Sequence, residues 1–342
     1  MRCPVCGDDC VGKASEILTA VPTIFSRCPD CSGRPLDKRL PPPDRWYAPP
    51  CACGKRFIDE VFAHMHVIMQ EDGLLHESDP LLAVGTPMVH PGFSMRAPPY
   101  LPKQSLLLLS PVITRDTAGR IVREVPEVRG VVRTGDFIPG VIDIREGHAP
   151  RVYELLAGCD VRADIFSSAG ASLVLYKQQS LIHIEFPRRW NPKITNVESE
   201  VKRVHPSWFV DACAGVGTLG LTGALMGVPH VVLNDAWFAA SFWAGFNLAV
   251  NAEFFDIQKV SLLKDYETMK RQPVGGEPVR IAETTGGQDI VVYQGDFNEL
   301  YRVLPDEPVL AVIDLFEKDD RQAVAGITEK WRAHVAGEVF IP

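Results

Sequence analysis

Val210-Asp-Ala-Cys-Ala-Gly-Val-Gly-Thr-Leu-Gly220 is the segment that says most about the architecture of this chain. A helical run and then His230-Val-Val-Leu-Asn-Asp235 follow it. The order strand, glycine turn, helix, strand and acidic residue is typical of the first half of a nucleotide-cofactor fold. The glycines let the backbone approach a ligand closely and let the helix begin tight against the sheet. The segment therefore predicts an α/β domain in which Asp235 accepts hydrogen bonds from two ribose hydroxyls.

Two cofactors fit this geometry. Gly215, Gly217 and Gly220 spell G-x-G-x-x-G, and an acidic residue follows about 20 residues later, as in a dinucleotide site, so an NAD(P)-dependent oxidoreductase is one alternative. Asp211 argues against it, because the turn and the helix N-terminus would hold a pyrophosphate that this carboxylate repels. S-adenosylmethionine instead brings an ammonium and a sulfonium, which a carboxylate attracts. The pattern D-x-x-x-G-x-G thus favours S-adenosylmethionine.

Two later segments carry acidic residues toward the same region. Residues 288–296 read as a strand ending in Gly-Asp, and Asp296 is expected to meet the adenine amino group. Residues 308–317 begin with the continuous apolar run of a buried parallel strand. That strand delivers Asp314 and Phe316 to the carboxyl edge of the sheet, where α/β sites lie. A helix is expected over residues 319–335 and a last strand over 337–342.

The chain resembles a known family in four segments, which are Asp211–Gly217, Asp235–Ala240, Phe246–Asn251 and Gly295–Asp296. On these residues it resembles class I methyltransferases and, within them, the archaeal and eukaryotic tRNA guanosine methyltransferases with their wybutosine-pathway relatives. The resemblance covers roughly residues 195–317. It implies a Rossmann-like domain that binds S-adenosylmethionine and acts on RNA, with tRNA as the leading substrate. The cofactor-binding residues that it implies are Asp211, Ala214, Gly215, Gly217, Asp235, Ala236, Asp296 and Phe297.

The chain departs from the family after the fourth strand. Methyltransferases that act on nitrogen usually carry Asn/Asp-Pro-Pro-aromatic or Asn-Leu-Pro there, whereas this chain has Asp314-Leu-Phe-Glu317. Asp314 and Phe316 are still the predicted catalytic residues, because they suit orienting and stacking a planar substrate. The family's final hairpin is expected to be absent, with upstream strands over residues 172–176 and 181–185 in its place.

The cysteines have metal-binding spacing rather than the pattern of a secreted disulfide protein. Cys3-Pro-Val-Cys6 and Cys28-Pro-Asp-Cys31 predict one tetrahedral, structural zinc site, with Cys51-Ala-Cys53 as a third half-site and Cys10 left over. Alternatively, Cys28 and Cys31 pair with Cys51 and Cys53, or a second zinc binds if His64 or His66 joins. An iron–sulfur cluster is a further alternative. The predicted metal ligands are Cys3, Cys6, Cys28, Cys31, Cys51 and Cys53.

Composition and charge limit the possible classes. The chain has 342 residues, of which 46% are hydrophobic, enough for two or three domains with cores of their own. There is no apolar run as long as a membrane span, and Met1-Arg-Cys-Pro does not resemble a signal peptide, so a cytoplasmic protein is expected. Residues 206–342 carry 10 basic and 19 acidic side chains, and residues 101–205 carry 15 and 12. The basic cluster is Arg188, Arg189, Lys193, Lys202 and Arg203.

The predicted organisation has three parts. Residues 1–57 form a zinc-ribbon-like module, residues 58–195 an α+β recognition domain, and residues 196–342 the Rossmann-like domain. Within the middle part we expect helices over 58–70 and 150–157, strands over 105–110 and 128–133, and a hairpin around Lys177-Gln-Gln. The predicted function is an S-adenosylmethionine-dependent methyltransferase acting on RNA. A protein side-chain methyltransferase is the main alternative, and aminocarboxypropyl transfer from the same cofactor is a related one.

Overall fold

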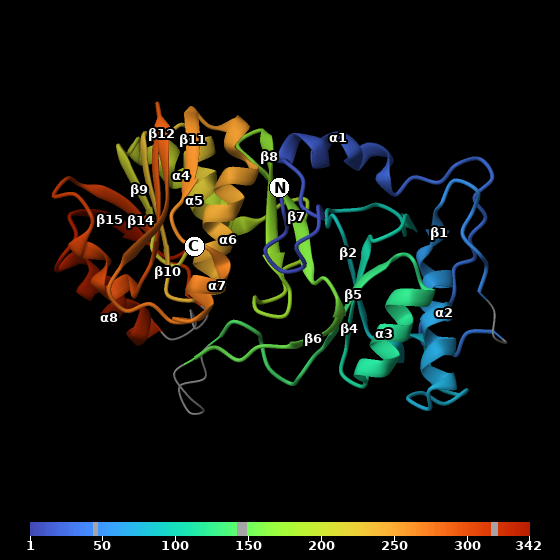
Figure 1. Cartoon of the computed structure of the whole chain (residues 1–342). Helices are drawn as coiled ribbons and strands as arrows, with labels where there is room; N and C mark the ends of the chain where they lie inside the picture. Colours follow the sequence, from blue (N-terminus) through green and yellow to red (C-terminus); the bar gives the residue numbers. More distant parts are fainter. Residues whose placement is uncertain (44–46, 142–148, 316–320) are drawn as a thin grey trace. The chain divides into compact units, whose positions relative to one another are not determined.

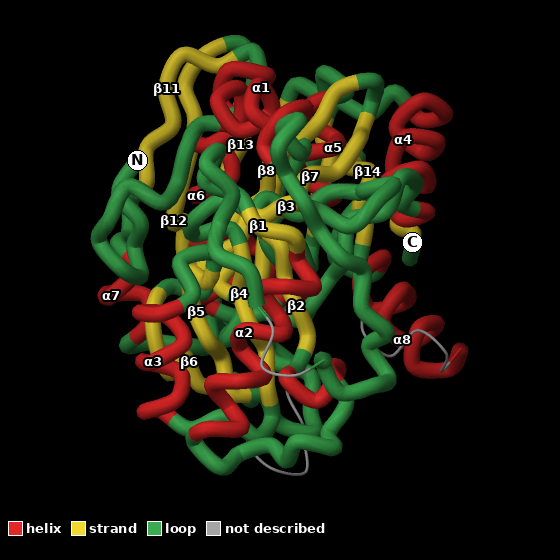
Figure 2. Tube along the Cα trace, turned by 90° about the vertical axis from the view of Figure 1, so that its right-hand side faces the viewer, coloured by secondary structure: helices red, strands yellow, loops and turns green. Residues whose placement is uncertain are grey.

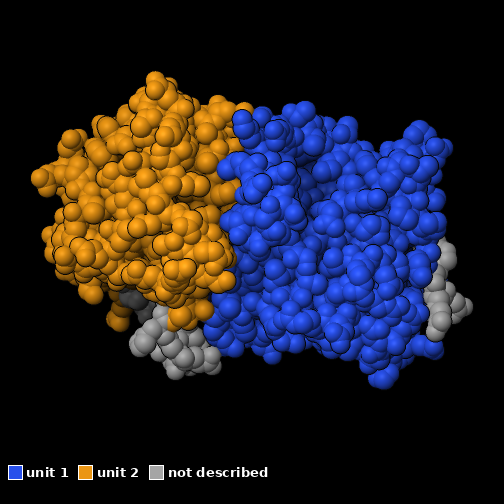
Figure 3. All heavy atoms as spheres, viewed as in Figure 1, with its two compact units in different colours: residues 1–141, 151–164, 178–186 blue, residues 142–150, 165–177, 187–342 orange. Residues whose placement is uncertain are grey.

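The computed structural model describes residues 1–43, 47–141, 149–315 and 321–342. The predicted catalytic residue Phe316 therefore lies outside the described residues. The chain forms two compact units (Figure 1, Figure 3). The first comprises residues 1–141, 151–164 and 178–186, and the second holds the other described residues. The first unit contains residues 1–57 together with much of 58–195, which the sequence predicts as two separate parts. They belong together because Phe25 and Val61 share one hydrophobic core.

The second unit is built on a seven-stranded sheet in the order β11-β12-β13-β10-β9-β14-β15. The strands are β9 (Trp208–Asp211), β10 (His230–Asp235), β11 (Ile257–Leu262), β12 (Val279–Gly286), β13 (Asp289–Gln294), β14 (Val309–Val312) and β15 (Gly337–Phe340). The five neighbouring strands from β13 to β15 are parallel. Their order reverses at β9, which has β10 on one side and β14 on the other. The predicted α/β class with a Rossmann-like C-terminal sheet is confirmed.

Helices cover both faces of this sheet. They are α4 (Pro192–Val204), α5 (Thr218–Leu225), α6 (Phe238–Val250), η2 (Ala252–Phe254), α7 (Tyr266–Lys270), η3 (Phe297–Arg302) and α8 (Arg321–Arg332). Figure 1 shows α4, α5 and α6 on one face and α8 on the other. Trp331 and Val335 join Val210 and Val339 in one apolar cluster on the α8 face. Helix α6 is buried nearly all round, as its lack of a polar face predicts. The helix and strand predicted after residue 318 are present.

The prediction that upstream strands extend the sheet is wrong. The antiparallel pair β11–β12 extends it instead, beside β13. The upstream strands β7 (Val161–Ser168) and β8 (Ala171–Gln178) form a two-stranded sheet of their own. Their turn is Ala169-Gly170 rather than Lys177-Gln-Gln, and both turn residues have positive φ, +48° and +80°. Two central residues with positive φ give the turn twist that suits a tight hairpin.

The first unit contains a four-stranded sheet in the order β2-β4-β5-β6. Helices α2 and α3 lie beside this sheet (Figure 2). Their apolar residues and those of the sheet form one hydrophobic core. The elements are α1 (Ala14–Ile24), β1 (Arg56–Phe57), α2 (Ile58–Glu71), η1 (Leu81–Val84), β2 (Thr86–Val89), β3 (Tyr100–Leu101), β4 (Leu106–Ser110), α3 (Arg115–Glu124), β5 (Val128–Arg133) and β6 (Glu154–Gly158). The helix predicted from residue 58 and the strands predicted from residues 105 and 128 are confirmed.

The helix predicted over residues 150–157 is wrong. This stretch enters strand β6, whose Leu155 pairs with Val132 of β5 in antiparallel register. Pairing with β5 and packing on the hydrophobic core outweigh the intrinsic helix propensity of this segment. Separately, no helix among the described residues is long and apolar enough to cross a membrane.

Candidate cofactor site and cysteine clusters

Four aspartates gather at the carboxyl edge of the parallel strands. Asp211 ends β9, Asp235 ends β10, Asp296 follows β13 and Asp314 follows β14. Strands β9 and β14 are neighbours at the point where the strand order reverses. Open α/β sheets bind their ligands at this point. The structure therefore places these four predicted site residues along one edge of the sheet.

The turn between β9 and α5 is joined to Asp235. Gly215 and Gly217 have φ of +55° and +97°, a left-handed conformation that favours glycine. The N–H of Gly215 donates to Oδ2 of Asp235 over 2.9 Å, and the N–H of Trp237 donates to Oδ1 over 2.9 Å. Each carboxylate oxygen keeps a lone pair for a further donor. The side chain is thus oriented by the backbone and can still accept ribose hydroxyls.

The protonation of Asp235 is sensitive to its surroundings. Burial raises the pKa of Asp235 to about 6, and the N–H groups of Trp237 and Gly215 counteract part of the rise. Ala214 and Ala236 are the other residues predicted to bind the cofactor near Asp235. Ala214 is buried, and the carbonyl of Ala236 accepts the N–H of Gly275 over 2.8 Å. The Asp235 carboxylate therefore loses its negative charge as the pH falls through about 6.

Asp211 caps helix α5 from the preceding strand. The N-cap residue, Gly217, has no side chain to do so. Instead, Oδ2 of Asp211 accepts the N–H of Gly220 over 2.7 Å, and Asp211 is fully buried. Burial raises the pKa of Asp211 well above its usual range, and the charges of Asp314 and Asp235 add to the rise. The helix N-terminus, where a pyrophosphate would bind, already faces a carboxylate.

Gly220 also lets α5 lie close to the sheet. A Cβ at this position would stand 2.5 Å from Cγ of Leu233 on β10. The third glycine of the motif thus serves helix–strand packing, as the sequence predicts.

Asn234 fixes the spacing of the loops that carry the aspartates, a role that the sequence analysis missed. Its Nδ2 donates to the carbonyl of Ala212 over 3.0 Å and to the carbonyl of Gly295 over 2.9 Å. The side chain is buried. One amide on β10 therefore connects the segments that follow β9 and β13. Its position just before Asp235 was the available signal.

Asp296 and Phe297 lie where β13 passes into η3. Oδ1 of Asp296 accepts the N–H of Asn298 over 2.9 Å, so this carboxylate caps η3. Phe297 is half-buried and packs on the apolar cluster beneath the sheet. Both residues follow the carboxyl end of β13, and Asp296 keeps lone pairs that can accept a further hydrogen bond.

Asp314 is paired with a lysine that the sequence analysis placed only in a basic cluster. Nζ of Lys193 lies 2.7 Å from Oδ2 of Asp314. Lys193 is held at the start of α4, because Oδ1 of Asn191 accepts its N–H over 3.0 Å. The pair is partly exposed, with the lysine side chain 42% and the aspartate side chain 19% accessible. It presents one positive and one negative group beside the acidic edge.

Asn247 in α6 and Asn251, the residue that follows this helix, bind strand β8 as a neighbouring strand would. Asn247 accepts the N–H of Tyr176 over 2.7 Å and donates to its carbonyl over 2.9 Å. Asn251 makes the same two bonds to Val174, over 2.9 Å and 2.8 Å. The match follows from geometry, since four residues of helix rise about 6 Å and two residues of strand rise about 6.7 Å. Asn247 also donates to the carbonyl of Val216 in the glycine turn, over 3.0 Å.

The cysteines form two groups of four, both within the first unit. One is Cys3, Cys6, Cys10 and Cys159, and the other is Cys28, Cys31, Cys51 and Cys53. Within each group all sulfur atoms lie within 4.8 Å of one another. The leading prediction, which joined the two C-P-x-C pairs in one site, is wrong. The structure shows the alternative pairing, in which Cys28 and Cys31 lie with Cys51 and Cys53. Each C-P-x-C defines only half a site, and the fold selects the other half.

The two histidines proposed as extra ligands have other partners. His64 lies on α2, and its Nδ1 is 3.1 Å from a guanidinium nitrogen of Arg56. Burial and the Arg56 charge lower the pKa of His64 to about 4. His66 is fully buried, with Nε2 2.9 Å from the carbonyl oxygen of Asp79. Both are core residues.

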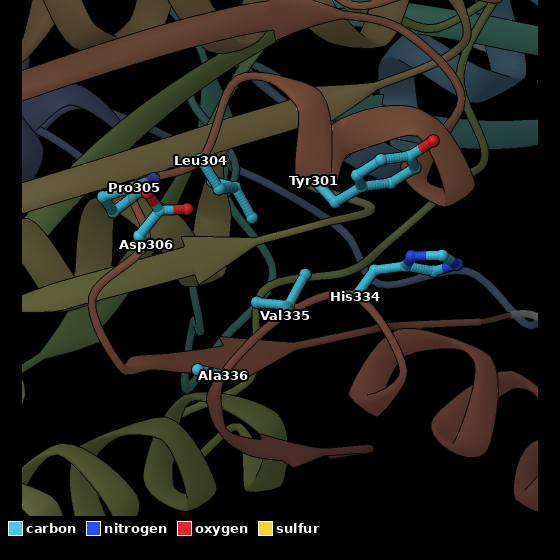
Figure 4. Close-up of a pocket in the computed structure, with 7 residues that line it drawn as sticks. All are labelled: Tyr301, Leu304, Pro305, Asp306, His334, Val335 and Ala336. Carbon is cyan, nitrogen blue, oxygen red and sulfur yellow. The ribbon is translucent and has the colours of Figure 1, made fainter.

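A small pocket in the second unit lies away from the four aspartates. It encloses about 200 Å³, and Figure 4 shows its lining residues, Tyr301, Leu304, Pro305, Asp306, His334, Val335 and Ala336. These residues precede β14 and β15, so the pocket lies at the amino ends of the strands. The aspartates lie at the carboxyl ends.

Comparisons with known proteins do not assign a family. No protein-family model matches the chain, and no curated protein matches it. Among solved structures it is similar to TYW2 of Pyrococcus horikoshii in complex with MeSAdo, at 15% identity and a TM-score of 0.39, over 82% of this chain and 78% of that one. It is also similar to Trm5b of Pyrococcus abyssi, at 14% identity and a TM-score of 0.34, over 68% and 56%. A third, PH0793 of P. horikoshii, has 15% identity and a TM-score of 0.40, over 82% and 78%.

Proposed function

We propose that the chain is an S-adenosylmethionine-dependent methyltransferase. The observation that carries the proposal is the buried carboxylate of Asp211 at the N-terminus of α5, beneath the glycine turn. Because burial raises the pKa of Asp211, a bound cation would hold this carboxylate ionised, and the ionised carboxylate would repel a pyrophosphate. Asp235, at the end of β10, offers the acceptors that a ribose needs. A nucleoside that carries a positive charge satisfies both conditions, and S-adenosylmethionine is such a molecule.

The proposed roles follow from the contacts. Asp235, held by the N–H groups of Gly215 and Trp237, would accept the ribose hydroxyls. Asp296 would accept the adenine amino group. Asp211 is turned into α5 rather than toward solvent, so we assign it a field effect on the sulfonium and ammonium in place of direct contact. Asn234 would hold the three carboxylates in fixed positions relative to one another, because it joins the segments after β9 and β13.

The Lys193–Asp314 pair is proposed to orient the methyl acceptor. When bound, S-adenosylmethionine would supply an activated methyl group to a lone pair of the acceptor, and the electron pair of the carbon–sulfur bond would stay on sulfur. Positioning supplies most of the acceleration for such a transfer. Asp314 can accept a hydrogen bond from the acceptor's N–H or O–H, and the contact with Lys193 holds the Asp314 side chain in place. Stacking by Phe316 stays a prediction from the sequence.

RNA is the substrate class that we favour. The segment leading into α4 exposes Arg188 and Arg189 and leaves Trp190 65% accessible. Exposed guanidinium and aromatic groups on consecutive residues suit an unpaired base and its phosphates. This segment ends three residues before Lys193, so RNA held there would be near the proposed acceptor position. The net negative charge of residues 206–342 keeps a protein side chain as the second candidate.

The test is a transfer assay with two labels. The purified chain is incubated with S-adenosylmethionine labelled with tritium in the methyl group and carbon-14 in the carboxyl group, together with a tRNA fraction or a protein extract. Tritium alone in tRNA supports methyl transfer to RNA. Carbon-14 in the acceptor would mean aminocarboxypropyl transfer, and tritium in protein would favour the alternative substrate. Absence of any transfer, with NADH binding instead, would overturn the proposal.

We also propose a structural zinc at Cys28, Cys31, Cys51 and Cys53. Sγ of Cys28 lies 3.7 Å from that of Cys51, and Sγ of Cys31 lies 3.5 Å from that of Cys53. These separations fit four thiolates around one ion, and a site filled by four cysteines leaves no open position for catalysis. The local spacing of these ligands is that of a zinc ribbon.

A further inference from the structure

The second cysteine group joins the N-terminus to a distant part of the first unit. Cys3, Cys6 and Cys10 come from the first ten residues, and Cys159 comes from the link between β6 and β7. Sγ of Cys159 lies 3.8 Å from Sγ of Cys3 and 3.8 Å from Sγ of Cys10, and Sγ of Cys6 lies 3.5 Å from Sγ of Cys10. Cys10 and Cys159 had no assigned partner in the sequence analysis.

We propose that Cys3, Cys6, Cys10 and Cys159 form a second zinc site that fastens the N-terminal segment to the β6–β7 link. Four thiolates around one zinc at about 2.3 Å stand about 3.8 Å apart in a tetrahedron, which matches the observed separations. A disulfide is excluded for these pairs, because its sulfurs would be about 2.05 Å apart. In a four-iron cluster each cysteine binds a different iron, so the sulfurs would stand farther apart than around a single ion.

The backbone holds both sides of the site in the geometry that ligation needs. The N–H of Cys159 donates to the carbonyl of Arg129 over 2.9 Å, which fixes this cysteine to β5. The next residue, Asp160, is buried, and its carboxylate accepts the N–H of Ser180 over 2.9 Å. On the other side, the N–H of Gly7 donates to the carbonyl of Cys3 over 3.0 Å and closes the knuckle. Cys159 is thus a fixed ligand on a packed framework.

The metal would be the main attachment of the N-terminal segment. Among residues 1–13, Cys3 and Val11 are the buried ones, so the segment brings little apolar surface to the core. A link between Cys10 and Cys159 closes a loop over a separation of 149 residues. Such a long closure strongly restricts the unfolded chain. Zinc binding and folding of this segment are therefore expected to be coupled.

The two zinc sites should differ in how readily they lose metal. Cys3 and Cys159 are buried, whereas Cys53 of the other site is exposed and its partners are intermediate. A chelator reaches an exposed thiolate first. We expect biphasic zinc release, with the Cys28/Cys31/Cys51/Cys53 site emptying before the Cys3/Cys6/Cys10/Cys159 site.

The test uses the full chain purified in the presence of zinc. Elemental analysis is expected to give two zinc ions per chain, and X-ray absorption at the zinc edge four sulfur neighbours for each. C159S should lower the content to one, and so should the matched variant C53S at the other site. Hydrogen exchange distinguishes the two variants, because C159S should accelerate amide exchange in residues 3–13 and C53S should not.

Two outcomes would overturn the inference. One is a single zinc in the unaltered chain, or iron in its place, which needs no variant and so does not depend on how C159S folds. The other is a C159S protein that keeps two zinc ions and an unchanged N-terminal exchange pattern. Neither readout uses cofactor binding or transfer, so failure here is distinguishable from failure of the proposed function.

Discussion

Replacing Asn247 with alanine should destabilise the second unit and weaken cofactor binding together. The side chain is fully buried and makes three hydrogen bonds, two to Tyr176 and one to the carbonyl of Val216. Each buried group left without a partner costs about 1–3 kcal/mol, so a loss of about 3 kcal/mol or more is expected. For a unit of this size that corresponds to a fall in Tm of roughly 6–12 °C.

Asn251 provides the matched control. It is equally buried and also makes three bonds, but these go to Val174 and to the carbonyl of Asn247, with none to the glycine turn. N251A should therefore lower Tm about as much as N247A, measured by calorimetry. At a temperature where both variants are folded, titration with S-adenosylhomocysteine should show weaker binding for N247A alone. Equal losses of affinity in both variants, or in neither, would refute the role of the Val216 contact.

Three further predictions concern the same unit. Burial raises the pKa of Asp235 to about 6, and the ionised form is the ribose acceptor. The affinity for S-adenosylhomocysteine should therefore fall about tenfold from pH 7 to pH 5. D235N should remove this part of the pH dependence, and a D235N profile like that of the unaltered chain would contradict the assignment. K193M should slow single-turnover transfer without changing cofactor affinity, whereas R203M, at the far end of α4, should leave the rate unchanged; equal effects would argue against a role for the Lys193–Asp314 pair. G220A should destabilise the fold by about 1–3 kcal/mol in denaturant unfolding, since its Cβ would meet Leu233. The control G326A in α8 places its Cβ where no atom lies within 4 Å, so it should be neutral or stabilising. A neutral G220A would count against the packing argument.

The parts of the fold that could be predicted are those encoded locally. The glycine turn, the strand before it and the acidic residue after it lie within 26 residues of one another, from Val210 to Asp235. Their apolar runs and backbone requirements specify strand, turn and helix without reference to the rest of the chain. The same holds for helix α2 and strands β4 and β5, which have clear periodicity or continuous apolar runs.

The parts that could not be predicted depend on partners far apart in the sequence. Residues 150–157 have no turn signal that marks a strand, and those from Glu154 onward enter β6 because β5 is available for pairing. Lys193 meets Asp314 across 121 residues, and Cys159 joins Cys10 across 149. A single sequence contains the side chains of such pairs and no indication of which of them meet. The choice of cysteine partners failed for this reason, although the metal-binding spacing itself was recognisable.

The most direct measurement of the central claim is calorimetric titration of the purified chain with S-adenosylhomocysteine, with NADH as the competing ligand and D235A as the variant. We predict micromolar binding of S-adenosylhomocysteine, loss of that binding in D235A, and undetectable binding of NADH. Binding of NADH with no binding of S-adenosylhomocysteine would contradict the account, because it would mean that the carboxylate of Asp211 does not exclude a pyrophosphate from the N-terminus of α5.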